Sequence, residues 1–337
     1  MTSSLKLQSG NYRWKTSLTL ARRVGTFLIL CLSAWYVYAH RQDLKIILTV
    51  SWTSVAWLLL ASVLNTLSNA AQCVCVYKAL GAPMKIWESF HLSNLSSAVG
   101  LFVSQGTTIT KTIYLKSRYQ VPFSKAPAIY LGLLVVFFII GAMMITAHIS
   151  FAALRGIEVP FIYWLVLAGA AISLILLKMD VPLLAKWLPG RAGKMVSLFA
   201  EGWKCIRGNR SCLVMACVCQ VFIFVTAGLR IYLAYRAMGL EINPISAVSV
   251  AVFVHFSGLL MLTPGNLGVQ EAVYGYLTVT EGMSFANGVA VSALIRGVDL
   301  VATAFLAPIA WYILFYRRGI HISRSEISAV HEEGAAK

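Results

Sequence analysis

Three ionisable side chains interrupt long apolar stretches in the second half of the chain: Glu271, Arg296 and Asp299. Charges within such stretches are costly in a membrane, so they either pair with one another or mark a substrate or proton pathway. Arg296 and Asp299 are three residues apart and would share one helix face, where they can pair. The arginine fork also suits a phosphate group, so a structural and a ligand-binding interpretation both stay open. Arg230, which follows an apolar run ending at Leu229, is a further candidate substrate-binding residue.

A helix-breaking segment lies just before Glu271. Its breaking residues are Pro264, Gly265, Asn266 and Gly268. We expect residues 263–268 to form the tip of a hairpin that lines a polar cavity, because each unsatisfied amide in lipid costs several kcal/mol. The glycines would allow close backbone approach, headgroup binding or both. In the first turn after the tip, Glu271 would either stabilise the helix N-terminus by about 0.3 to 1 kcal/mol or serve as a site for a cation, an amine or a proton.

A weaker broken segment occurs in the first half, over residues 86–115. It contains Gly106 at the expected break and Lys111 shortly after it. We expect Lys111 to reach the same cavity and to bind an anion, with Gly106 near the substrate. Lys116, Arg118 and Lys125 would form a basic mouth on the cytoplasmic side.

The composition indicates whether these residues lie in a membrane or in water. The chain of 337 residues is 59% hydrophobic and only 12% charged, with a mean hydropathy of +0.76. These values predict an integral membrane protein. The excess of 28 Lys and Arg over 12 Asp and Glu is then explained by cytoplasmic loops and anionic lipid headgroups, and no nucleic-acid partner is expected.

The uncharged stretches predict an all-α protein with about six full spans and two re-entrant helical hairpins in one membrane domain over residues 1–337. The predicted spans are 24–40, 46–77, 126–154, 159–177, 211–229 and 282–316. The predicted hairpins begin at residues 86 and 242. Residues 178–210 have a basic, Trp-containing pattern that predicts an amphipathic connector on the cytoplasmic membrane surface. Residues 317–337 form a polar cytoplasmic tail.

Two halves of the chain resemble each other, over residues 46–154 and 211–316. The segment YKALG at 77–81 returns as YRAMG at 235–239. The broken segment SQGTTITK from Ser104 takes the place of TPGNLGVQ from Thr263, and a third landmark, from Phe123 and Met283, follows in the same order. Landmarks in one order at a nearly constant offset indicate an internal repeat.

The distribution of basic residues predicts how the repeats lie in the membrane. If both hairpins return to the side from which they enter, 22 Lys and Arg fall in the cytoplasm and five outside, Arg230 among the five. Both termini are then cytoplasmic, in what we expect to be the bacterial cytoplasmic membrane. The two repeats become inverted, which is a recurring design of secondary transporters.

The pattern Pro264-Gly265-x-x-Gly268-x-x-Glu271-Ala272, followed by an arginine in the last span, resembles a known signature. It is similar to that of the flippase-like membrane family that includes the transmembrane region of lysylphosphatidylglycerol synthases. Asn266 stands where that family often has another glycine. The resemblance implies the movement of a lipid with a polar headgroup between leaflets. The soluble aminoacyl-transfer domain of the synthases is not expected here, so their enzymatic activity is not carried over.

The sequence therefore predicts a lipid flippase-like transporter rather than an enzyme. Its substrate would be an anionic phospholipid or a prenyl-phosphate-linked glycolipid. No cofactor is expected, because the acidic residues are scattered and neither a zinc motif nor a nucleotide-binding loop occurs. The alternative is a non-transporting scaffold or accessory subunit for a partner enzyme that modifies lipids or assembles polysaccharides.

Overall fold

The computed structural model describes residues 49–103, 106–123, 125–156, 159, 161–178, 191–260 and 263–316. The predicted span at 24–40 and the polar tail at 317–337 lie outside these residues. Within them the regular structure is helical, as the composition predicted.

Each half of the chain has the same order of elements. The first half comprises α2 (Trp52–Ala79), α3 (Ile86–Phe102), α4 (Gly106–Tyr119) and α5 (Lys125–Leu154). The second half comprises α9 (Arg210–Ala237), α10 (Pro244–Leu260), the short 3-10 turn η2 (Pro264–Asn266), α11 (Val269–Thr280), α12 (Phe285–Trp311) and the π-helical turn η3 (Tyr312–Tyr316). Between the halves lie α6 (Ile162–Lys178) and α8 (Arg191–Arg207).

Four helices of the described residues are long and apolar enough to cross a membrane. They cover Trp52–Ala79, Ala128–Leu154, Arg210–Ala237 and Phe285–Tyr316. Large apolar side chains on their surfaces, such as Trp57, Met143, Phe222 and Phe305, are exposed. So much exposed apolar surface is typical of contact with lipid rather than with water.

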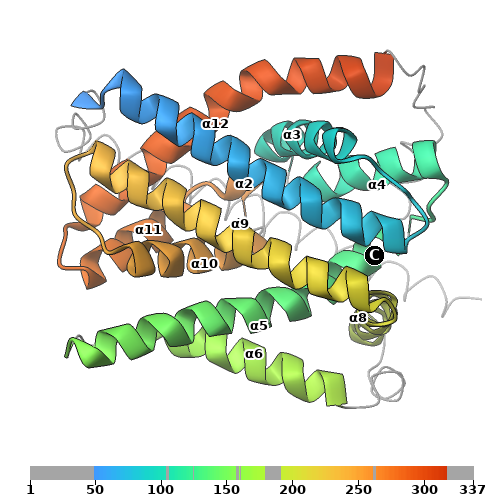
Figure 1. Ribbon diagram of the computed structural model, residues 1–337, viewed down its shortest axis with the longest axis horizontal. Coiled ribbons are helices and arrows are strands. Elements are labelled where there is room, and N and C mark those ends of the chain that lie inside the picture. The colour runs from blue at the N-terminus through green and yellow to red at the C-terminus, as the bar shows by residue number, and fades with distance from the viewer. Residues whose placement is uncertain are drawn as a thin grey trace, which may run out of the picture.

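The two broken segments form pairs of short helices that open at opposite ends of the bundle (Figure 1). In that view α2 runs from left to right and α9 from right to left. The pair α3 and α4 opens to the right, while α10 and α11 open to the left. The closed ends of the two pairs meet in the middle, where η2 packs against α3.

The repeated segments YKALG and YRAMG share one local structure, a helix C-terminus closed by a left-handed glycine. Gly81 has φ 80° and Gly239 has φ 68°. In the first copy the Ala82 amide donates to the Tyr77 carbonyl at 2.9 Å, and in the second the Leu240 amide donates to the Tyr235 carbonyl at 2.9 Å. This 6→1 bond defines the Schellman motif, which needs glycine at its left-handed position. The two repeated segments therefore form the same helix C-cap.

The buried apolar side chains form two clusters. One gathers residues of α5, α9, α10, α11 and α12, and includes Phe224, Val250 and Leu294. The other joins α2, α3 and α4 to η3, and includes Tyr114 and Phe315. Helices α10 and α11 thus belong to one apolar cluster, and α3 and α4 belong to the other.

Helix α8 lies across the ends of the long helices. Figure 1 shows it end-on, whereas α2, α5 and α9 run across the picture. Its Gly202 touches α5 so closely that an added Cβ would lie 1.8 Å from the Ala128 carbonyl oxygen. Helix α8 covers residues 191–207 of the predicted connector, and residues 179–190 lie outside the described part. The position of this segment at the cytoplasmic membrane surface stays a prediction.

Candidate functional site

The tip of the second helix pair has the backbone geometry that its glycines predicted. Gly265, Asn266 and Gly268 have φ of 59°, 55° and 81°. Such left-handed conformations are routine for glycine and occasional for asparagine. The tip is also tied to itself and to α10, because the Asn266 side-chain amide donates to Ser257 at 3.0 Å and the Thr263 hydroxyl donates to the Leu267 carbonyl at 2.7 Å.

Arg296 of α12 holds this tip in place. Its guanidinium donates to the carbonyl oxygens of Gly265 at 2.9 Å and Asn266 at 3.0 Å. It also forms an ion pair with Glu271, with 2.5 Å between Nε and Oε1. Glu271 in turn accepts from the Gly268 amide at 2.7 Å, which confirms its predicted place in the first turn of α11. One arginine thus satisfies carbonyls and a carboxylate that the break in the helix leaves exposed.

A second ion pair joins α9 to α12. Arg230 donates to both carboxylate oxygens of Asp299 at 2.9 Å, and the Ser62 hydroxyl of α2 donates to the same carboxylate at 3.0 Å. Two expectations are corrected here. Arg296 and Asp299 do not pair with each other, since each has its partner on another helix. Arg230 is not in an outer connection either, because α9 continues through apolar residues to Ala237.

A polar cavity of about 310 Å³ lies between α2, α3, α4 and α12, and we call it the Lys111 cavity. Its uncharged polar lining comes from hydroxyl and amide side chains of Ser62, Asn65, Thr66, Asn69, Ser93, Asn94, Ser97, Thr107 and Thr303. Lys111, Arg230 and Asp299 are its charged residues. The cavity therefore combines an anion-binding group with many hydrogen-bonding groups in the middle of the bundle.

Lys111 differs from the two arginines, because no carboxylate of the described residues lies within ion-pair distance of it. Its ammonium group contacts the Cys73 sulfur at 3.7 Å and lies 5.7 Å from the centre of the Tyr130 ring. Both contacts are weak compared with a paired charge. The structure places Lys111 in a cavity, but residues 263–268 do not line it, so the predicted cavity shared by Lys111 and the tip is not observed. Anion binding by Lys111 stays a prediction.

A second polar cavity, of about 220 Å³, lies on the other side of the Arg230 and Asp299 pair; we call it the Arg296 cavity. Its lining residues include His255, Gln270, Tyr274 and Arg296, together with Arg230 and Asp299. The Lys111 and Arg296 cavities thus share one ion pair.

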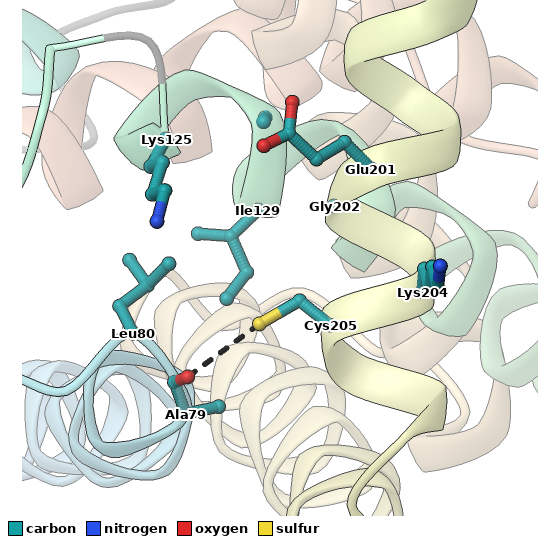
Figure 2. Close-up of a pocket in the computed structure, with 9 residues that line it drawn as sticks. Ala79, Leu80, Lys125, Ile129, Glu201, Gly202, Lys204 and Cys205 are labelled. Atoms are coloured by element: carbon teal, nitrogen blue, oxygen red, sulfur yellow. Dashed lines mark hydrogen bonds between the residues drawn. The ribbon is translucent and has the colours of Figure 1, made fainter.

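A further cavity, of about 290 Å³, lies away from these charges, at the junction of α2, α5 and α8. Figure 2 shows Lys125 and Glu201 at its border and the Cys205 thiol directed at the Ala79 carbonyl, at 3.5 Å. Lys125 was predicted to belong to a basic mouth. It lies at the N-terminus of α5, beside the C-terminus of α2.

The structure brings together most of the predicted site residues. Pro264, Gly265, Asn266, Gly268, Glu271 and Arg296 form the pinned tip, and Lys111, Arg230 and Asp299 line the Lys111 cavity. The prediction that the tip lines a polar cavity is corrected, because residues 263–268 line neither the Lys111 cavity nor the Arg296 cavity. Gly106 does not line them either; it lets α3 and α4 approach, since an added Cβ would lie 2.7 Å from the Val99 carbonyl oxygen. A substrate-binding role for the tip residues stays a prediction.

Sequence reasoning missed the polar face of α2. Ser62, Asn65, Thr66 and Asn69 follow the three- and four-residue spacing of one helix face. That spacing within an otherwise apolar helix was the signal, because polar residues in a span face the bundle interior or a cavity.

A bundle of long apolar helices, with charges paired between helices and polar cavities inside it, is a membrane protein. The comparison with protein families gives its family. The family described as the lysylphosphatidylglycerol synthase TM region matches residues 18–307, and the chain belongs to this family. No curated protein and no solved structure matches the chain.

Proposed function

We propose that this protein moves a lipid with an anionic, phosphate-bearing headgroup between the leaflets of a membrane. One observation carries the proposal. Two polar cavities with a shared ion pair occupy the middle of a bundle whose outer surface is apolar. A headgroup within these cavities would avoid the hydrocarbon, while its acyl or prenyl tails would stay in lipid.

The topology that suits this function has two re-entrant hairpins in inverted repeats. The opposite openings of α3–α4 and α10–α11 support it (Figure 1). Lys78, Lys85, Lys116, Arg118 and Lys125 gather at the open end of the first hairpin. By the positive-inside rule that end is cytoplasmic. The anion would therefore enter at the basic end, in the bacterial cytoplasmic membrane.

Lys111 would be the first internal binding site for the phosphate. It is half-buried, so its attraction to an anion is screened less than that of the surface lysines. Arg230 would be the next. Because Asp299 now occupies its guanidinium, a phosphate must displace that carboxylate to pass from the Lys111 cavity to the Arg296 cavity.

The test uses purified full-length protein in liposomes that contain a fluorescent or chemically accessible phospholipid or prenyl-phosphate glycolipid. Wild type should move the anionic lipid between leaflets faster than protein-free vesicles do. Lys111→Met should reduce the rate at least about tenfold, if one charge-assisted contact worth about 1.5 kcal/mol or more is lost. Lys116→Met is the matched comparison at the basic entrance and should reduce the rate much less than Lys111→Met does, because Lys116 lies outside the cavity.

The alternative, a scaffold for a partner enzyme, predicts a different result. If no candidate lipid moves faster than in empty vesicles, while a lipid-modifying or polysaccharide-assembling enzyme is recovered with the protein, the protein is a scaffold instead. In that case Lys111→Met should alter neither assembly with the enzyme nor its activity.

A further inference from the structure

The ion pair between Arg230 and Asp299 lies between two cavities, and its two side chains differ in exposure. Both residues line the Lys111 cavity and the Arg296 cavity. The Asp299 side chain is 41% exposed, whereas the Arg230 side chain is 15% exposed. In the other ion pair the two side chains are almost equally buried, with Arg296 18% and Glu271 19% exposed. The Asp299 carboxylate is therefore placed to exchange a proton with water in the cavities.

Arg230 is the cation that compensates the charge of Asp299. It donates to both carboxylate oxygens at 2.9 Å, and no other Lys or Arg of the described residues lies within ion-pair distance of them. Glu271, the other carboxylate nearby, is bonded to Arg296 and lines neither cavity. The described residues of α2 and α3 add only uncharged side chains to the linings. The remaining ionisable groups of the two linings are Lys111 of α4, His255 of α10, Tyr274 of α11 and Arg296 of α12 itself.

An anion and the Asp299 carboxylate compete for the same guanidinium. When a phosphate takes Arg230, Asp299 loses both charge-assisted hydrogen bonds and acquires a second negative charge beside it. An ionised carboxylate without a cation is costly inside a membrane bundle, and such a group becomes neutral by taking up a proton. The ion pair thus links the binding of an anion to the binding of a proton.

Ser62 gives the neutral form of Asp299 a hydrogen-bond partner. Its hydroxyl donates to the Asp299 carboxylate at 3.0 Å. A hydroxyl oxygen also has two lone pairs, so the same group can accept from the O–H of a protonated carboxyl after its own hydrogen rotates away. Both protonation states of Asp299 therefore keep a hydrogen bond to α2.

We propose that Asp299 is a proton-binding site coupled to anion binding at Arg230. As the anion displaces Asp299 from the guanidinium, one carboxylate oxygen takes a proton from water in the cavity. When the anion leaves, the proton returns to water and the ion pair forms again. One negative charge and one proton therefore occupy the site together, and its net charge does not change. This inference rests on the proposed function and adds the ion that is coupled to it.

The test counts the protons that accompany binding. Full-length protein in detergent is titrated calorimetrically with dioctanoyl phosphatidylmethanol, a phosphodiester that keeps one negative charge between about pH 6 and pH 8. Titrations in two buffers of different ionisation enthalpy give the number of protons taken up by the protein. Wild type should take up a large fraction of one proton per anion. Its affinity should accordingly rise as the pH falls, by up to about tenfold per pH unit.

Asp299→Asn is the diagnostic variant, because an amide has the shape of the carboxyl group but takes up no proton. It should bind the probe without proton uptake and with the same affinity at each pH. The matched control is Glu241→Gln, since Glu241 is exposed in the connection after α9 and lines neither cavity. His255→Asn examines the histidine of the Arg296 cavity, because histidine commonly gains a proton near neutral pH. Both of these variants should keep the proton uptake of wild type.

Three outcomes would overturn the inference while lipid binding and transport are still observed. They are anion binding by wild type without proton uptake, uptake that persists in Asp299→Asn, and uptake that is lost in His255→Asn. If Asp299→Asn does not fold, wild type and His255→Asn still test the inference, because both must take up protons. Failure of the proposed function is distinct: the probe would not bind at any pH, or soluble dimethyl phosphate would bind as tightly as the lipid.

Discussion

The two helix pairs meet at the centre of the molecule, and they differ in whether their central charged side chain has a charged partner. In the second pair, Arg296 donates to two tip carbonyls and forms an ion pair with Glu271. In the first pair, Lys111 faces a cavity without a carboxylate partner among the described residues. A charged side chain that is bonded to the surrounding backbone stabilises the local structure. A charged side chain without an oppositely charged partner can instead bind a ligand. Under the proposed function, the second pair would be the fixed side of the pathway and the first pair the binding side.

The internal repeat also places different side chains at equivalent positions of α2 and α9. At the offset of 158 residues that relates Tyr77 to Tyr235, Arg230 corresponds to Gln72. Gln72 donates to Gln220 at 2.9 Å, a neutral contact between α2 and α9, whereas Arg230 reaches Asp299 of α12. The repeats thus keep their helices and caps but differ in which helix interface carries charge.

The largest expected effect comes from removal of the arginine that pins the second tip. Arg296→Met leaves half-buried Glu271 without its cation and two tip carbonyls without a donor. Breaking a fully buried pair costs about 3 to 5 kcal/mol, and this pair is only partly buried, so its loss should cost less than that. We expect a large loss of thermal stability in detergent, measured by the unfolding of purified protein.

Lys111 of the first helix pair provides the control for Arg296. Lys111→Met removes a cation that has no carboxylate partner, so its melting temperature should stay near that of wild type. If the two variants lose stability equally, the distinction between a fixed side and a binding side is wrong.

A smaller effect is expected from the backbone of the pinned tip. Gly265→Ala forces a Cβ into φ 59°, which costs about 1 to 2 kcal/mol. The Cβ itself would only touch Leu101, at 3.5 Å from its carbonyl oxygen, so the cost is conformational rather than steric. Equilibrium unfolding measures it. Gly258→Ala, in α10 with open space around its Cβ, should be neutral or slightly stabilising, and equal losses at both positions would contradict this account of the tip.

The smallest effect concerns the open end of the second pair, which carries Glu281 where the first pair has basic residues. Burial raises the pKa of Glu281, which lies in the connection after α11. Between the pKa of Glu281 in the unfolded chain, about 4, and its higher pKa in the folded protein, the folded state binds more protons. The contribution of Glu281 to the free energy of unfolding therefore falls as the pH rises through this window. Glu281→Gln should remove this contribution and slightly stabilise the protein at neutral pH. Exposed Glu241→Gln is the control, and an unchanged pH profile in Glu281→Gln would show that burial has no such effect.

Much of the fold could be predicted because its signals are local. Apolar length predicted the long helices, the glycines at 265 and 268 predicted the break before Glu271, and YKALG with YRAMG predicted a repeat that proved to be a helix cap. Each of these depends on neighbouring residues in the chain, which a sequence displays directly.

The ion-pair partners could not be predicted in the same way. Arg230 and Asp299 are far apart in sequence, and their pairing depends on how α9 packs against α12. The spacing of Arg296 and Asp299 suggested a pair within one helix, but Glu271 and the tip carbonyls offered Arg296 more contacts. The uncharged polar lining of the Lys111 cavity was also missed, because single serines and asparagines in α2 and α3 carry little signal until several helices bring them together.

The central claim is that the two helix pairs enter the membrane from opposite faces, and residue accessibility tests it most directly. Pro122→Cys and Met283→Cys lie in the connections after α4 and α11, at opposite ends of the bundle (Figure 1). Each is placed in a variant without native cysteines and treated in sealed vesicles with a thiol reagent that does not cross the membrane. The account predicts labelling of the two positions from opposite sides, with Pro122→Cys on the cytoplasmic side. Labelling of both positions from the same side would contradict it.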